Sequence, residues 1–226
     1  SDVLLPENYL QEVDKFLQEN YCDCFGGPDA SHPSFSNTQK AIDYTMTSFF
    51  TTGGIRGKKS SVNDFQPRSF NMGISQKAFE ASGGFGQIHP GENAVVFHKR
   101  RIDWSKFYTQ VKKFGLVRPI LNKWHPGSAK ITYWFPAVFT FGLLFAVLLL
   151  KLGFWWLFLL YVLYFMLIAT HASIKNKSLG IGLLAVYAAL VQFFGYGYGF
   201  IKSVWYIQIL KQDPELKFPN LFFKNV

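Results

Sequence analysis

Two pairs of residues in this chain have side chains and spacings that could carry chemistry. Cys22 and Cys24 stand two residues apart in Cys-Asp-Cys, so on a strand both thiols would lie on one face. A metal or redox site is one interpretation, and two small core residues in a reducing cytoplasm is the one we favour. Gln110 and Lys113 are three residues apart, so on a helix they project together from one polar face toward the soluble part of the chain.

The other polar residues form no familiar catalytic pattern. The 5 histidines share no spacing that indicates a metal cluster, and the chain has no Gly-rich P-loop, nucleophile elbow or zinc motif. A glycine turn, Gly26-Gly27-Pro28-Asp29, follows an apolar run at residues 22–25, and α/β folds place ligands at such strand ends. Asp29 is therefore a candidate to contact a ligand, or a turn-capping residue with no further role.

Helix and strand patterns alternate over the first hundred residues. Ser36-x-x-Gln39 is a capping-box pattern that opens a helix, Ser75 can cap a short helix over residues 76–81, and residues 94–97 form an apolar strand run. Asp103 can cap a helix ending near Gly115, with one apolar face. We expect an α/β domain followed by an amphipathic helix at the membrane surface, whose lipid-facing residues are Trp104, Phe107, Tyr108, Val111 and Phe114.

The second part of the chain has the composition of a membrane region. Residues 1–130 hold 16 Lys and Arg and 12 Asp and Glu, whereas residues 131–226 hold 7 and 2. Uncharged runs cover residues 131–150, 152–169 and 179–201, each long enough to cross a hydrocarbon core of about 30 Å as a helix. Trp and Tyr residues flank these runs, as at membrane interfaces. The alternative, a buried hairpin in a large soluble protein, fits such long runs poorly.

Basic residues predict the orientation. Residues 95–130 carry nine Lys and Arg against one acid, Asp103, immediately before the first apolar run. The positive-inside rule therefore predicts a cytoplasmic soluble part, and Arg100 and Arg101 are candidates to anchor anionic headgroups. The C-terminal tail disagrees, because three full crossings would place its basic residues outside. Either the rule fails there, or the last apolar segment does not cross fully.

Five short motifs, in order along the chain, resemble those of membrane-bound family-2 glycosyltransferases. Ser1-Asp2-Val3-Leu4-Leu5-Pro6 resembles the end of the Asp-x-Asp motif and the loop after it. Three stretches then resemble the approach to the Gly-Glu-Asp motif: Asn71-Met72-Gly73, Gly83-Gly84-Phe85 and His89-Pro90-Gly91-Glu92. The last motif, Gln110-Val111-Lys112-Lys113-Phe114, resembles Gln-x-x-Arg-Trp, with Lys for Arg and Phe for Trp.

The resemblance implies a partial GT-A fold, which is a Rossmann-like mixed α/β sheet, then an interfacial helix and about three transmembrane helices. Residues 1–102 would be the later part of the catalytic domain, 103–130 the interfacial helix with a basic linker, and 131–226 the membrane region with a tail. The nucleotide-binding first half of the domain is not among these residues. Asn93 follows Glu92 where the family has Asp and then a helix, so we expect a missing segment between residues 92 and 93.

The resemblance also assigns roles. Asp2 would hold the Mg²⁺ or Mn²⁺ that stabilises the diphosphate leaving group, and Asp29 would contact the sugar or the acceptor. Glu92 would mark the acidic motif, whose Asp is the catalytic base in the family. Gln110 and Lys113 would contact the donor diphosphate, Lys113 as a point charge where Arg would bind bidentately. An ordinary solvated helix face is the alternative for this last pair.

The implied function is an inverting, metal-dependent transfer of a sugar from a nucleotide-diphosphate donor to a lipid-linked or polysaccharide acceptor, as in polysaccharide biosynthesis. We expect an integral protein of the inner (plasma) membrane with a cytoplasmic catalytic domain and no nucleic-acid partner. The alternative is a non-catalytic membrane scaffold subunit with a degenerate transferase-like domain. A transporter fits less well, because the three apolar runs carry no acidic or basic residue for an ion relay.

Overall fold

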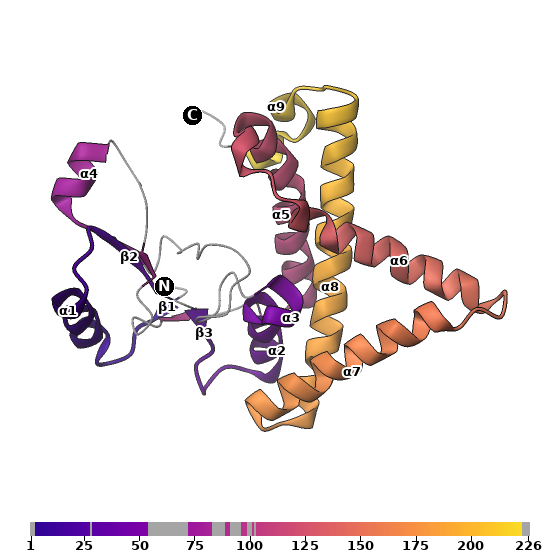
Figure 1. Ribbon diagram of the computed structural model, residues 1–226, viewed down its shortest axis with the longest axis horizontal. Helices are drawn as coiled ribbons and strands as arrows, with labels where there is room; N and C mark the ends of the chain where they lie inside the picture. The colour runs from indigo at the N-terminus through magenta and orange to yellow at the C-terminus, as the bar shows by residue number, and fades with distance from the viewer. Residues whose placement is uncertain are drawn as a thin grey trace. The chain divides into compact units, whose positions relative to one another are not determined.

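The computed structural model describes residues 3–27, 29–53, 72–82, 89–90, 96–98, 101 and 103–222. The chain divides into two compact units, Ser1–Arg101 and Ile102–Val226. Figure 1 labels their elements, and each unit is described by itself below.

The first unit holds short elements. Its helices are α1 (Tyr9–Glu19), α2 (Asn37–Thr47), α3 (Phe49–Thr52) and α4 (Gln76–Ser82). Its strands are β1 (Val3–Leu4), β2 (Cys24–Gly26), β3 (Asp29–Ala30), β4 (Met72–Ile74), β5 (His89–Pro90) and β6 (Val96–His98).

The strands form two separate small sheets. One has the order β1-β6-β3, with β1 antiparallel and β3 parallel to the central β6. The other has the order β4-β2-β5, with β4 antiparallel and β5 parallel to the central β2. Strands of 2 or 3 residues contribute few ladder hydrogen bonds, so each sheet depends on the helices and loops around it.

The prediction of a Rossmann-like mixed sheet, as in a GT-A domain, is wrong for the residues that the structure describes. Most of them are helical, and the strands do not join into one sheet with helices on both faces. The physical reason is visible in the sequence. A parallel sheet buried on both faces needs strands with continuous runs of Val, Ile and Leu, whereas β2 is Cys-Phe-Gly and meets a Gly-Pro turn after 3 residues.

The predicted helix starts are confirmed at three caps. Ser36 and Gln39 form the full capping box of α2, with the Ser36 hydroxyl accepting from the Gln39 N–H at 3.2 Å and the Gln39 side chain accepting from the Ser36 N–H at 3.1 Å. The Ser75 hydroxyl accepts from the Ala78 N–H at 3.1 Å before α4. Asp103 caps the first helix of the second unit, accepting from the Ser105 N–H at 2.7 Å.

The described residues of the second unit form helices and the turns that join them. Its α-helices are α5 (Trp104–Trp124), α6 (Phe135–Leu150), α7 (Trp156–Asn176), α8 (Leu179–Ser203) and α9 (Pro214–Lys217). A π-helical stretch, Val204–Ile209, continues α8, and short 3-10 turns cover Pro126–Ser128, Ile131–Trp134 and Pro219–Leu221. Helix α5 passes Gly115 and the internal Pro119 before it ends, so it is longer than the helix expected from the sequence.

Helix α8 is the element against which the other long helices pack. Figure 1 shows α5 along one side of α8, while α6 and α7 leave from the other side as a hairpin. Glycines allow the closest approaches. A Cβ added at Gly195 would lie 2.6 Å from Val111 Cγ2 of α5, and one added at Gly197 would lie 2.9 Å from the Pro136 carbonyl oxygen of α6. One added at Gly182 would lie 2.5 Å from the Ala169 carbonyl oxygen of α7.

Aromatic rings and two hydroxyl groups join α6 to α7 within the hairpin and α6 to α8. Phe139 of α6 lies with its ring centroid 4.5 Å from that of Phe193 in α8 and 4.9 Å from that of Tyr161 in α7. Thr140 donates to the Phe193 carbonyl oxygen at 3.2 Å, and Tyr161 donates to the Phe139 carbonyl oxygen at 3.1 Å. In a membrane, lipid is as apolar as the helix surfaces, so the hydrophobic effect does not drive helices together. Close packing and hydrogen bonds of this kind hold them together instead.

Among the described residues, three helices are long and apolar enough to span a membrane, which fits a membrane protein. They are Ile131–Leu150, Trp156–Asn176 and Leu179–Ile209. The expected apolar runs at residues 131–150, 152–169 and 179–201 thus correspond to helices, the second of which starts four residues later and the last two of which extend further. At about 1.5 Å per residue each is about 30 Å long or more.

Replacing Gly199 by Ala should destabilise the second unit. The new Cβ would press on the Lys112 carbonyl oxygen, which belongs to the α5 backbone and cannot rotate away. Overpacking of this kind costs about 1–3 kcal/mol. The matched control is Gly180→Ala in the first turn of the same helix, because its Cβ would meet only the Ser178 hydroxyl oxygen, at 3.8 Å.

Thermal unfolding of the detergent-purified chain measures the difference. The Gly199→Ala midpoint should fall below that of the unchanged chain, and the Gly180→Ala midpoint should stay level or rise, because Ala favours helix over Gly. Equal midpoints for the two variants would show that α5 and α8 do not approach as closely as the structure has them.

Candidate functional site

The polar face of α5 carries the one predicted pair of site residues that the structure describes with side chains. Gln110 is half-buried and Lys113 is exposed, and they lie one turn apart. The opposite face of α5 packs on α8: Val111 and Tyr108 lie against Gly195, and Gly115 lies against the Tyr196 carbonyl group. Gln110 and Lys113 therefore project away from α8, while the opposite face of α5 packs against α8 and fixes the position of the helix.

The apolar face of α5 corrects an expectation. Trp104, Phe107, Tyr108, Val111 and Phe114 were expected to face lipid. Phe107 and Val111 are instead fully buried, and the Trp104 ring packs edge-on against Tyr187 of α8 with centroids 4.8 Å apart. An amphipathic helix buries its apolar stripe against whatever apolar surface is nearest, and in this chain that surface is α8.

Of the three predicted acidic residues, the structure describes the backbone of Asp29 alone. Asp29 begins β3, and its backbone pairs with Val96 of β6. Val3, which directly follows Asp2 in the sequence, pairs with His98 at the other side of β6. Glu92 precedes β6 by four residues in the sequence. Asp2 and Glu92 themselves lie outside the described residues, as does the expected break between residues 92 and 93.

The backbone of Asp29 begins β3, which pairs in parallel with β6. Whether its side chain contacts a ligand or caps the turn before it stays a prediction. The structure thus brings Asp29 to the same strand, β6, as the residue that follows Asp2. Gln110 and Lys113 belong to the other compact unit.

Asp23 forms a polar cluster that the sequence patterns did not single out. The Asp23 carboxylate accepts a hydrogen bond from the Ser75 hydroxyl at 2.6 Å and another from the Tyr21 hydroxyl at 3.1 Å. These two hydrogen bonds hold the pKa of the Asp23 carboxyl below its usual range. The Ser75 N–H also donates to the Asp23 carbonyl oxygen at 2.7 Å. The cluster is exposed and joins the start of β2 to the start of α4, so its described contacts are structural.

The two cysteines have the properties of packing residues. Cys24 is buried in β2, and Cys22 is half-buried just before it. Burial raises the pKa of both thiols, which lowers the fraction present as reactive thiolate. Neither a metal nor a nucleophilic role is favoured by these surroundings.

No group of three or more His, Cys, Asp or Glu side chains able to hold a metal ion occurs in the part of the chain that the structure describes. A metal site of the kind expected would therefore depend on Asp2 and on other residues outside that part. The described side chains by themselves do not fit such a site.

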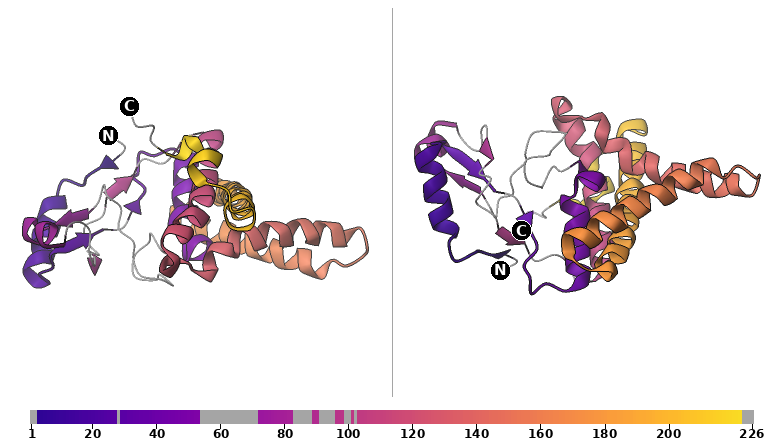
Figure 2. Two further views of the ribbon diagram at one scale, coloured as in Figure 1. Left: turned by 90° about the horizontal axis from the view of Figure 1, so that it is seen from above. Right: turned by 60° about the horizontal axis from the view of Figure 1, so that its bottom comes forward.

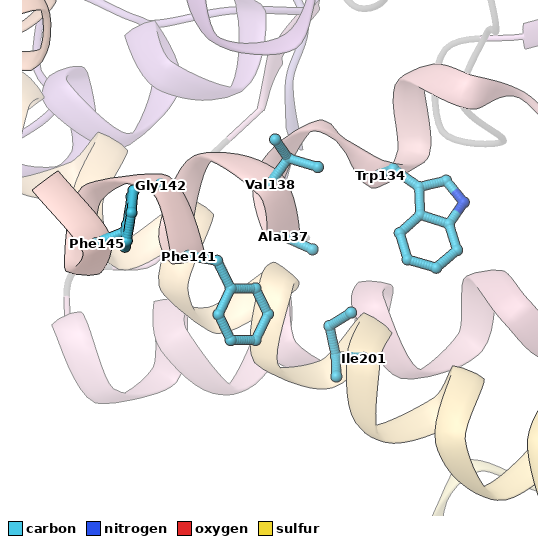
Figure 3. A pocket seen from close by; sticks show the side chains of 7 residues that line it. All are labelled: Trp134, Ala137, Val138, Phe141, Gly142, Phe145 and Ile201. Atoms are coloured by element: carbon cyan, nitrogen blue, oxygen red, sulfur yellow. The ribbon is translucent and has the colours of Figure 1, made fainter. Parts of the chain in front are cut away.

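An apolar groove of about 390 Å³ lies along α6 where this helix meets α8. Figure 3 shows its lining, in which α6 supplies all the residues but Trp134, from the turn just before α6, and Ile201, from α8. The groove offers hydrocarbon contacts and almost no polar surface, so it cannot hold a reacting group. Its lining residues are Trp134, Ala137, Val138, Phe141, Gly142, Phe145 and Ile201.

Comparison of the chain with models of protein families, with curated proteins and with solved structures gives no match to any of them.

Proposed function

We propose that this chain belongs to a membrane-bound glycosyltransferase resembling family 2. The reaction would move a sugar from a nucleotide-diphosphate donor to a lipid-linked or polysaccharide acceptor at the cytoplasmic face of the inner membrane, with inversion. The observation that carries the proposal is the polar face of α5, where Gln110 and Lys113 stand together on a helix held firmly against an apolar helix. A helix in that position joins a soluble unit to membrane helices.

The chemistry proposed for α5 is stabilisation of the leaving group. As the bond from the sugar to the donor breaks, negative charge develops on the diphosphate, and fixed donors aimed at that charge lower the barrier. The Gln110 amide can donate hydrogen bonds to phosphate oxygens, and the Lys113 ammonium adds a point charge with three donors. The packing of Gly115 on the Tyr196 carbonyl group supports this role, because a rigid helix loses little entropy when the donor binds.

The strand order of the first unit supports a shared location for two of the acidic residues. Strand β6 pairs on one side with β1, whose Val3 directly follows Asp2 in the sequence, and on the other side with β3, which begins at Asp29. Carboxylates serve such a reaction as metal ligands and as the base that deprotonates the acceptor hydroxyl. In the proposal Asp2 is the metal ligand and Asp29 contacts the sugar or acceptor.

One sequence feature favours the second candidate function, a non-catalytic scaffold subunit. Asn93 follows Glu92 where the resemblance requires the Asp that acts as base, and an amide cannot accept the acceptor's proton. The full gene sequence separates the two candidates. An Asp directly after Glu92 in the encoded protein supports the enzyme, and Asn in that position supports the scaffold.

A lipid-linked acceptor suits the second unit better than a soluble one. The groove beside α6 is apolar and sits among helices apolar enough to lie in a bilayer, so it can hold part of a lipid chain. A lipid anchored in this way would keep its chain in the membrane while its polar head lies in the headgroup region.

Alanine substitution of Gln110 or Lys113 should lower sugar transfer, because each removes one contact to the donor diphosphate. A hydrogen bond to a charged group contributes about 1.5–3 kcal/mol, which corresponds to a roughly ten- to hundredfold loss in rate. Lys113→Arg should retain activity, since a guanidinium can bind the phosphates bidentately. The measurement is product formation from a panel of nucleotide sugars in native membranes that contain the protein as its gene encodes it.

The control is Lys123→Ala, which removes one positive charge from the exposed last turn of the same helix. Its activity should match that of the unchanged protein, and all four variants should appear in the membrane fraction at equal levels. Full turnover in both Gln110→Ala and Lys113→Ala would mean that the motif resemblance on α5 is accidental.

A further inference from the structure

Helices α5 and α8 run side by side in the same direction. Trp104 at the start of α5 packs on Tyr187, Val111 lies against Gly195, and near the end of α5 Ile120 shares a core cluster with Ile207. The residue offset between partners stays nearly constant along this series. About the last two-thirds of the continuous helix Leu179–Ile209 therefore lies alongside the full length of α5.

Helix α5 is too strongly charged to lie in hydrocarbon. It has five basic residues and no acid, spread over about 26 Å at 1.5 Å per residue. A Lys or Arg at the centre of a bilayer costs about 2.5–3.5 kcal/mol on insertion scales. Because the two helices are in register, keeping α5 in water or among headgroups keeps most of α8 there as well. The basic residues are Lys106, Lys112, Lys113, Arg118 and Lys123.

The hairpin formed by α6, the turn at residues 151–155 and α7 has the opposite character. Lys151, at its tip, is the single charged residue between Ile131 and Ile174. Beside it the rings of Trp155 and Trp156 stack with centroids 3.9 Å apart, and both are exposed, as interfacial Trp residues are. Large apolar side chains along the outer half of the hairpin are also exposed: Phe141, Leu144, Phe145, Leu148, Leu159, Leu160 and Leu163.

The direction of the hairpin separates it from α8. In the left view of Figure 2 the reader looks along α8, while α6 and α7 run across the page, away from α5. Figure 1 agrees, with α8 between α5 and the hairpin.

We propose that the chain crosses the bilayer twice, as the α6–α7 hairpin, and that α8 lies along the cytoplasmic surface between the hairpin and α5. The partner of the exposed hairpin surface is the hydrocarbon of the bilayer. The basic residues at the base of the hairpin and beyond it are then on one side, and Lys151 alone is on the other, as the positive-inside rule requires. Those on the cytoplasmic side include Lys130, Lys175, Lys177, Lys202, Lys211 and Lys217.

This topology removes the conflict that three crossings create. With three crossings Lys202, Lys211 and Lys217 would lie outside, and the cations of α5 would be drawn into the bilayer beside α8. With two crossings both ends of the second unit are cytoplasmic. The proposal does not depend on the glycosyltransferase activity, and a scaffold subunit would have the same topology.

Reporter fusions to the full chain test the side of the C-terminus. Green fluorescent protein fused after Val226 should fluoresce, and alkaline phosphatase fused at the same position should be inactive, because the first works only inside the cell and the second only outside. Active phosphatase at the C-terminus would show a third crossing and overturn the proposal.

Thiol labelling gives a second, independent measurement with small changes at exposed positions. In a chain with Cys22→Ser and Cys24→Ala, a membrane-impermeant maleimide should label Lys151→Cys in intact cells, and should label Glu215→Cys of α9 only after permeabilisation. Labelling of Glu215→Cys in intact cells would contradict the cytoplasmic tail. Failure to label Lys151→Cys until permeabilisation would contradict the hairpin crossing. The fusions carry the test alone if the cysteine-free chain does not accumulate.

Discussion

The backbone of α5 meets the backbone of α8 at glycines, and the second unit depends on this contact. Gly115 on α5 admits the Tyr196 carbonyl group, and Gly199 on α8 admits the Lys112 carbonyl group. Helices with glycine at the contact can bring their backbones close together and gain many van der Waals contacts. These contacts are the main attraction between helices near lipid. Gly197, two residues before Gly199, faces the start of α6 instead. One short glycine-rich stretch therefore fixes a charged helix on one side of α8 and an apolar helix on the other.

This arrangement divides the second unit into a polar side and an apolar side. The Lys112 ammonium lies 5.2 Å from the centroid of the Tyr198 ring, and the Arg118 guanidinium lies 4.3 Å from that of Tyr133, just before α6. Cation–π contacts of this kind let basic side chains lie against an aromatic surface while their charge stays near water. The polar side carries Gln110 and Lys113, which would face a donor nucleotide. The apolar side carries the groove beside α6, which could hold a lipid chain.

Local signals in the sequence predicted the helices well. The Ser36–Gln39 box, Ser75 and Asp103 are caps whose chemistry lies within one turn of chain, and long uncharged runs need no partner to be recognised. The prediction that α5 ends near Gly115 is wrong, and it was made because glycine commonly ends helices. Here Gly115 sits inside α5, and its missing Cβ makes room for another helix, which only the tertiary structure can show.

The sheet was predicted wrongly for a related reason. Apolar runs such as Cys22–Phe25 indicate strands, but which strands join into one sheet is decided by contacts distant in sequence, and short runs carry little information about them. Asp29 illustrates the point: its place after a glycine turn suggested a loop residue, while the parallel pairing with β6 makes it a strand residue. The likeness of the α5 motif to a diphosphate-binding motif rests on residue types and remains a prediction.

Both proposals rest on the register of α5 against α8, and oxidative cross-linking in membranes measures it directly. A Cβ at Gly195 would lie 2.6 Å from Val111 Cγ2, so Val111→Cys combined with Gly195→Cys should form a disulfide under mild oxidation, identified by mass spectrometry of the linked peptides. Gly180 lies about 22 Å from Gly195 along the same helix, so Val111→Cys combined with Gly180→Cys should not form one. A disulfide in the second pair, or none in the first, would contradict the parallel packing of α5 on α8.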